Sequence, residues 1–112
     1  MENIRDIIAK QDAAYREFYS ARELVNAWKR NPIVWSWGAH GWKLFDGKFL
    51  GFLVSGHHHK GYVWIMVNGN DLFDIYFTSV QGNIKRNLKD VYIEDLTEAV
   101  DIAVEKIGIY KY

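Results

Sequence analysis

Three consecutive histidines, His57, His58 and His59, are the residues of this 112-residue chain whose type and spacing most suggest metal binding. In an extended segment His57 and His59 project to one side, where a carboxylate such as Asp74 could complete a metal site. A catalytic zinc usually has three protein ligands, and the sequence contains no motif such as HExxH that supplies them together. We therefore expect no native metal and no cofactor, and keep a metal-dependent hydrolase centred on His57 and His59 as an alternative.

The sequence contains few features of nucleophilic, nucleotide-dependent or paired-carboxylate catalysis. The chain has no cysteine, which excludes disulfides, thiolate nucleophiles and cysteine-ligated zinc. Its serines lie outside a GxSxG motif, and its glycines form neither a P-loop nor a GxGxxG fingerprint. Asp71 and Asp74 are carboxylates that could act as a pair, but no feature of the sequence places them across a cleft. We predict that the protein is not an enzyme.

The overall composition narrows the class of protein and of partner. The 14 lysine and arginine residues are balanced by 14 acidic residues, so a partner held mainly by electrostatic attraction is not favoured. With 49% hydrophobic residues the chain can bury one core, and we expect a single domain over residues 1–112. The sequence has neither a signal-peptide pattern nor about 20 consecutive apolar residues, which predicts a cytoplasmic protein that makes no use of a membrane.

The N-terminal part of the chain has helical spacing. Apolar side chains recur at steps of three and four over residues 1–31, with charged residues on the other side. Ser20 and Glu23 match a capping box, which predicts a break or kink near Tyr19–Ser20 rather than one straight helix. Asn31 and Pro32 end the helix, because proline disfavours helical geometry in the residue before it.

The middle of the chain changes to the spacing of strands. We expect strands over residues 33–37, 42–45, 48–55, 62–67, 72–78 and 84–87. Asp46-Gly47 and the Asn68–Asp71 segment are hairpin signals, because these residue types tolerate positive φ. Such short connections favour an antiparallel meander of five or six strands, since parallel neighbours would need long crossovers.

Helical spacing returns over residues 90–107, with Asp90 as the expected N-cap and Gly108 as the expected stop. The predicted fold class is therefore α+β. It comprises an N-terminal helix kinked near Ser20, a five- to six-stranded antiparallel meander, and a C-terminal helix packed on one face of the sheet.

The two faces of the expected sheet differ in chemistry because side chains alternate along each strand. The apolar face, which the helices are expected to cover, comprises Leu50, Phe52, Val54, Val63, Ile65, Val67, Phe73, Ile75 and Phe77. The opposite face, which we call the mixed face, comprises Phe49, Gly51, Leu53, Ser55, Tyr62, Trp64, Met66, Leu72, Asp74, Tyr76 and Thr78. The mixed face is either half-solvated, or covered by the kinked N-terminal helix, or a recognition surface.

Segments of the sheet region resemble small, functionally uncharacterised proteins of bacteriophages and mobile elements. The resemblance is carried by VWSWGA (34–39), GYVWI (61–65) and NGNDLFDIYF (68–77), and it brings no catalytic or binding residues with it. It implies an accessory protein of the host cytoplasm that binds and antagonises a host protein, binds nucleic acid or sequesters a signalling nucleotide.

The favoured hypothesis is a small non-enzymatic binding protein that binds a host protein through the mixed face. A homo-oligomer is compatible with this hypothesis. Its candidate binding residues are His57, His59, Tyr62, Trp64, Asp74 and Tyr76. The alternative is a binder of single-stranded nucleic acid or of a nucleotide, with stacking by Tyr62, Trp64 and Tyr76 and phosphate contacts from Lys85, Arg86 and Lys89. The tryptophans at positions 35, 37 and 42 are either core residues or, in part, an exposed anchor.

Overall fold

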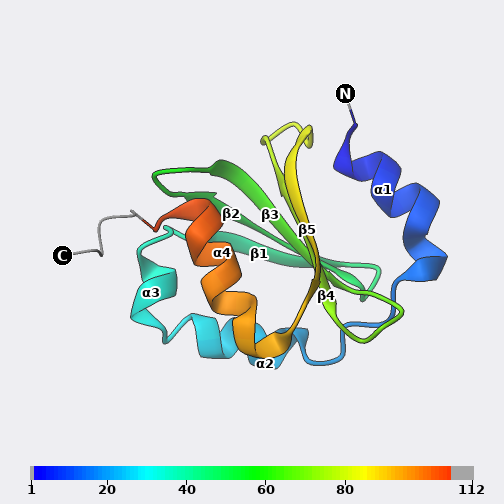
Figure 1. The fold of residues 1–112 in the computed structure, drawn as a ribbon, viewed down its shortest axis with the longest axis horizontal. Coiled ribbons are helices and arrows are strands. Elements are labelled where there is room, and N and C mark those ends of the chain that lie inside the picture. The colour runs from blue at the N-terminus through cyan, green and yellow to red at the C-terminus, as the bar shows by residue number, and fades with distance from the viewer. Residues whose placement is uncertain (1, 107–112) are drawn as a thin grey trace.

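The computed structural model describes residues 2–106, which form one sheet with helices on both of its faces (Figure 1). The helices are α1 (Ile4–Gln11), η1 (Asp12–Ala14), α2 (Ala21–Trp28), α3 (Pro32–Trp35), η2 (Ile93–Asp95) and α4 (Leu96–Val104). The strands are β1 (His40–Phe45), β2 (Phe49–Ser55), β3 (Lys60–Val67), β4 (Phe73–Thr78) and β5 (Ile84–Val91). This order confirms the predicted α+β class. Within residues 2–106, no helix has both the length and the apolar character needed to cross a bilayer.

The five strands form the predicted antiparallel meander, in the order β1-β2-β3-β4-β5. Asp46 in the β1–β2 connection has a φ of 53°, as its hairpin signal predicts. The strand expected over residues 33–37 is not present. Helix α3 forms there because the Asn31 Oδ1 accepts the Ile33 N–H at 2.9 Å and Pro32 occupies the first helical turn.

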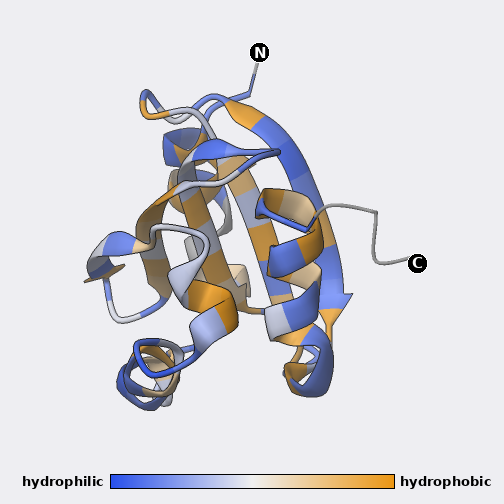
Figure 2. Cartoon of the chain, turned by 90° about the vertical axis from the view of Figure 1, so that its left-hand side faces the viewer, coloured by the Kyte–Doolittle hydropathy of each residue, from blue (hydrophilic) through white to orange (hydrophobic). Residues whose placement is uncertain are grey.

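The register of the strands confirms the two predicted faces. Gly51 lies beside Trp64, which lies beside Tyr76, so these three residues share the mixed face. Leu50 lies beside Ile65 on the apolar face. In Figure 2 the central strands are largely orange, whereas the edge strand β5 is largely blue. The core is therefore built on β2, β3 and β4.

Helices α2, α3 and α4 cover the apolar face. Their buried side chains are Ala21, Trp28, Val34, Leu96, Val100, Ala103 and Val104. Two indole N–H groups tie the layer together, because Trp28 donates to Thr97 Oγ1 and Trp37 donates to Asp101 Oδ1, each at 2.9 Å. Asp90 is not the N-cap of this helix. It lies in β5 with a φ of 56°, and the predicted stop at Gly108 lies outside the described residues.

The N-terminal segment departs from the predicted single kinked helix. Helix α1 already ends at Gln11. A new helix, α2, does begin at Ala21 with Ser20 at its N-cap position, as predicted, but the Ser20 side chain makes no capping hydrogen bond. The physical reason is a competing pairing with the sheet: the Arg16 N–H donates to the Val67 carbonyl at 2.9 Å, which draws the chain out of helical geometry.

Helix α1 covers the mixed face from the side opposite α4 (Figure 1). Its Ile4 and Ile7 are buried in a cluster with Tyr15, Phe49, Trp64, Met66 and Tyr76. The start of the helix is held by the sheet, since the Ile4 N–H donates to the Gly82 carbonyl at 2.8 Å. The open mixed face that the protein-binding hypothesis required is therefore not what the structure has, because the apolar stripe of α1 is buried on it.

The pairing of Gly51 with Trp64 shows why a glycine lies in the middle of β2. The Trp64 ring lies flat over Gly51, so that a Cβ added there would be 2.7 Å from Cζ3 and 2.8 Å from Cε3 of the indole. The indole N–H points toward Thr78 Oγ1 at 3.3 Å. Absence of a side chain at Gly51 thus fixes the plane in which Trp64 packs.

We expect Gly51→Ala to lower the free energy of unfolding by about 1–3 kcal/mol, because the added methyl group displaces a buried indole. Urea denaturation followed by tryptophan fluorescence measures the loss. Gly69→Ala is the matched control, since no atom lies within 4 Å of a Cβ at that position and we expect a change below about 0.5 kcal/mol. Equal stability of the two variants would contradict the packing described for Trp64.

Candidate functional site

A pocket of about 510 Å³ lies between α1 and the part of the mixed face near β1. Its walls come from α1, β1, β3, the β1–β2 turn and the β4–β5 loop. The lining residues are Ile4, Arg5, Ile8, Ala9, Lys43, Phe45, Asp46, Tyr62, Trp64, Val80, Gln81 and Gly82. The volume falls in the range of roughly 300–1,000 Å³ that is typical of sites for small molecules.

Aromatic rings form one wall of this pocket. Phe45 and Trp64 stack with ring centroids 5.6 Å apart and an angle of 29° between their planes. Tyr62 also packs against Trp64, at a tilt of 32° and with ring centroids 5.3 Å apart. Phe45 is 43% exposed although it is a large apolar side chain, so its ring is accessible from the solvent. Phe45, at the edge of the wall, is therefore the ring on which another ring can stack, whereas Trp64 is buried beside it.

Lys43 places a positive charge at the same wall. Its Nζ lies 4.8 Å from the centroid of the Tyr62 ring and 5.2 Å from that of Phe45, and it donates to the Tyr62 Oη at 3.1 Å. Arg5 adds a second cation from α1. Among the side chains that the structure describes, no carboxylate forms an ion pair with Lys43 or with Arg5. Asp46 is the acidic residue of the lining.

Two of the six binding residues predicted from the sequence, Tyr62 and Trp64, line the pocket. The other four do not. Asp74 and Tyr76 are buried under the N-terminal segment, with exposures of 5% and 2%. The structure thus assigns the mixed face two roles, with the pocket toward β1 and a closed polar interior toward β5.

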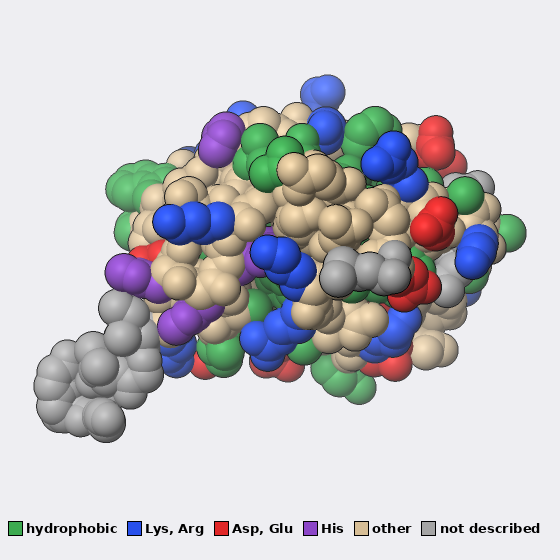
Figure 3. All heavy atoms as spheres, turned by 90° about the horizontal axis from the view of Figure 1, so that it is seen from above, with side chains coloured by type: hydrophobic (Ala, Val, Ile, Leu, Met, Phe, Trp, Pro, Cys, Tyr) green, Lys and Arg blue, Asp and Glu red, His purple; other side chains and the backbone are tan. Residues whose placement is uncertain are grey.

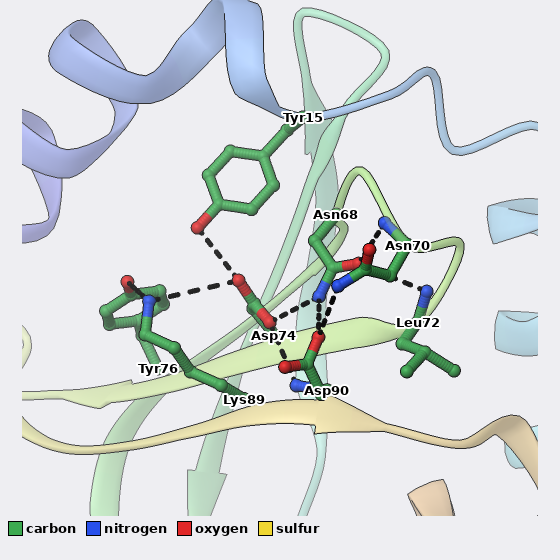
Figure 4. A network of polar contacts seen from close by, with 8 residues as sticks. All are labelled: Tyr15, Asn68, Asn70, Leu72, Asp74, Tyr76, Lys89 and Asp90. Carbon is green, nitrogen blue, oxygen red and sulfur yellow. Dashed lines mark hydrogen bonds and ion pairs between the residues drawn. The ribbon is translucent and has the colours of Figure 1, made fainter.

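The closed part is organised around the carboxylate of Asp74 (Figure 4). This group accepts hydrogen bonds from the Tyr15 hydroxyl at 3.1 Å, the Asn68 amide at 2.8 Å and the Asp90 backbone N–H at 3.1 Å. The Lys89 ammonium lies 3.9 Å from the same carboxylate and donates to the Tyr76 hydroxyl at 3.1 Å. The network joins the segment after α1 to β4, β5 and the β3–β4 turn.

Protonation states in this network support a structural role. Burial, with contributions from Tyr76 and Asp74, raises the pKa of the Tyr15 hydroxyl, so that it stays protonated and donates. The hydrogen bond to Tyr76 is the main cause that raises the pKa of Lys89, and the neighbouring carboxylates act in the same direction. Lys89, proposed above as a phosphate contact, is thus engaged within the protein.

The two predicted binding histidines lie in different environments. His57 is exposed and its Nε2 lies 3.5 Å from Glu105 Oε2. The His59 ring is buried, with Nε2 3.0 Å from the Tyr62 carbonyl and an edge-to-face contact with Phe77. Figure 3 shows the histidine side chains in the left-hand half of the upper face. Among the described residues, no three His, Asp or Glu side chains come together as a metal site would require.

The tryptophan group is divided between core and surface. Trp37 is fully buried and Trp42 stacks on Phe52, with ring centroids 4.4 Å apart. Trp35 is 63% exposed, and its indole N–H donates to the Lys29 carbonyl at 2.7 Å. Trp37 and Trp42 are therefore core residues, whereas the role of Trp35 as an exposed anchor stays a prediction.

Sequence reasoning predicted only Tyr62 and Trp64 among the residues that line the pocket, and it missed the two cations Lys43 and Arg5 and the exposed ring of Phe45. Lys43 and Phe45 alternate on one strand, a signal that would have placed both on one face had the register of β1 been known. The structure pairs Lys43 with Gly51 and Phe45 with Phe49, both mixed-face residues. Arg5 gave no signal beyond its place on the charged side of the N-terminal helix.

The comparisons with known proteins leave the pocket to be interpreted from its own geometry. No protein-family model, curated protein or solved structure matches this chain. What the pocket can do chemically follows from its aromatic wall, its size and the two cations in its lining.

We expect Asp74→Asn to cost about 1–3 kcal/mol of stability, because an amide cannot accept on both sides and leaves a buried donor unsatisfied. Asp71→Asn is the control: Asp71 is exposed, pairs with Arg16 at 3.4 Å, and its φ of 61° is tolerated by Asn. We expect its effect to stay below about 1 kcal/mol. Urea denaturation compares the two, and similar losses would argue against a structural role for Asp74.

His59 predicts a pH dependence of stability. Burial lowers its pKa below the ordinary value of 6.5, so the unfolded chain takes up this proton first as the pH falls. The contribution of His59 to stability is therefore constant above pH 7 and decreases below about pH 6.5 until the folded-state pKa is reached, with a slope of at most about 1.4 kcal/mol per pH unit. We expect His59→Gln to flatten this slope in urea denaturation series between pH 7 and pH 5. Identical slopes in both proteins would refute the assignment.

Proposed function

We propose that this protein is a small binding protein whose ligand is a planar aromatic molecule held in the pocket between α1 and the mixed face. The observation that carries the proposal is the aromatic wall, in which Phe45 stacks on Trp64 and Tyr62 packs at a tilt against Trp64, along a pocket of about 510 Å³. A ring inserted between this wall and α1 would contact aromatic carbons on one side and the side chains of Ile8 and Ala9 on the other.

The geometry favours a small molecule over a protein partner at this site. Trp64 is 6% exposed and Tyr76 is less exposed still, so a flat protein surface cannot reach them while α1 lies over the face. A small ligand needs only the opening beside Phe45. The role as an accessory factor acting on a host protein, which the resemblance implies, stays a prediction.

A nucleotide fits the proposal better than a long single strand of nucleic acid. The basic residues suggested as phosphate contacts do not line the pocket, and Arg86 pairs with Phe77 of the apolar face whereas Lys89 contacts Tyr76 of the mixed face. These residues therefore do not form one track beside a row of stacked bases. The net charge of zero points the same way.

Blocking the pocket tests the proposal. We expect some members of a library of planar aromatic compounds, neutral and anionic, to bind the wild-type protein in saturation-transfer NMR and to quench tryptophan fluorescence. Ala9→Phe places a ring in the pocket from an exposed helix position and should weaken this binding about tenfold or more, equivalent to about 1.4 kcal/mol.

Lys10→Phe is the matched control, because it adds the same ring to the neighbouring exposed residue of α1, which does not line the pocket. We expect it to bind like the wild type. If no compound binds with a Kd below about 1 mM, or if Ala9→Phe binds as well as the control, the proposed function is wrong.

A further inference from the structure

We propose that the ligand of this pocket carries an anionic group, a carboxylate or a phosphate, which is bound by Lys43 and Arg5. The inference rests on the proposed function and adds the charge of the ligand and the residues that recognise it. It begins from two cations in the lining of one pocket, neither of which has an ion-pair partner among the side chains that the structure describes.

Lys43 is positioned as a recognition group. An ammonium group has three donors, and the Tyr62 Oη, 3.1 Å away, takes one of them. The rings of Tyr62 and Phe45, 4.8 and 5.2 Å from the Nζ, hold the group beside the aromatic wall. A ring stacked on that wall would bring its substituents within reach of the remaining donors.

Arg5 contributes from the opposite wall, since it belongs to α1 whereas Lys43 belongs to β1. Its Nε donates to the Asn3 Oδ1 at 3.4 Å, which leaves the terminal N–H groups of the guanidinium to bind an oxyanion. Asp46 also lines the pocket and contributes one negative charge. The formal charge of the lining is therefore positive by one, in a chain whose net charge is zero.

The class of ligand follows from these two features together. An aromatic ring alone would contact the wall but leave Lys43 and Arg5 without an ion-pair partner. A simple oxyanion would pair with the cations but make no contact with the aromatic wall. An aromatic carboxylate and a nucleoside monophosphate each combine a planar ring with an anionic group. Both satisfy the shared chemistry, and the experiment separates them.

Matched pairs of neutral and anionic compounds test the inference: indole with indole-3-acetate, and adenosine with adenosine 5′-monophosphate. In isothermal titration of the wild-type protein at low salt, we expect the anionic member of at least one pair to bind about tenfold more tightly. The pair that shows the larger difference identifies a carboxylate or a phosphate as the preferred group. Inorganic phosphate alone should bind at least tenfold more weakly than the preferred anionic compound.

Two variants assign the effect to the residues. Lys43→Met retains an unbranched apolar stem on an exposed strand position, and Arg5→Gln retains a polar side chain on an exposed helix position. Each should lower the affinity for the anionic compound about fivefold to tenfold and change the affinity for the neutral compound less than twofold. Lys10→Gln, which removes a cation of α1 outside the pocket, should change neither. Circular dichroism verifies that each variant is folded.

The outcomes separate this inference from the proposed function. Equal binding of neutral and anionic compounds that Ala9→Phe still abolishes would overturn the inference and leave the proposed function standing. A loss of both compounds in Lys43→Met would also overturn it, because Lys43 would then act by shaping the wall. Absence of binding by every compound, in the pairs and in the library, would remove both proposals.

Discussion

The attachment of the N-terminal segment to the mixed face is the constraint on which the rest of the structure depends. Backbone hydrogen bonds hold it at both ends, from the Ile4 N–H to the Gly82 carbonyl at 2.8 Å and from the Arg16 N–H to the Val67 carbonyl at 2.9 Å. Between these points the chain buries Ile7 on aromatic residues of the sheet. An antiparallel sheet often leaves one face exposed to water, but here helices cover both faces. The mixed face is covered by α1, a single helix of eight residues, whereas three helices cover the apolar face.

The pocket is a consequence of that short cover. An α-helix of eight residues is about 12 Å long and, with its side chains, about 10 Å in diameter, whereas five strands spaced about 4.8 Å apart span about 19 Å. Helix α1 therefore cannot cover the whole mixed face. The part toward β4 and β5 is closed by the hydrogen bonds of Asp74, and the part toward β1 stays open with Phe45 at its edge.

The sequence predicts β2, β3 and β4 well because their alternation is continuous and the hairpin residues are distinctive. It also predicts a strand at β1, but it does not predict which side chains of β1 lie on the mixed face, because the register differs by one residue. A two-residue turn at Asp46-Gly47 would pair Phe45 with Lys48, but the structure adds a residue to the loop and pairs Phe45 with Phe49. A shift by one residue exchanges the faces of a strand, so Lys43 could not be placed beside Tyr62 from the sequence. Likewise, nothing in the local sequence of residues 12–19 predicts that Arg16 pairs with Val67, because this pairing is a tertiary contact.

The orientation of Lys43 differs from that of a lysine that only protects a sheet edge. Lysine on an edge strand commonly discourages pairing with another chain, and for that purpose its ammonium extends beyond the edge into the solvent. Here the Nζ lies instead over the sheet, 3.1 Å from the hydroxyl of Tyr62, although Tyr62 belongs to β3 and β2 lies between the two strands. The charge thus lies over the mixed face, beside the rings of Tyr62 and Phe45 that line the pocket. Protection of the edge would not require this inward direction, whereas contact with a group bound in the pocket would.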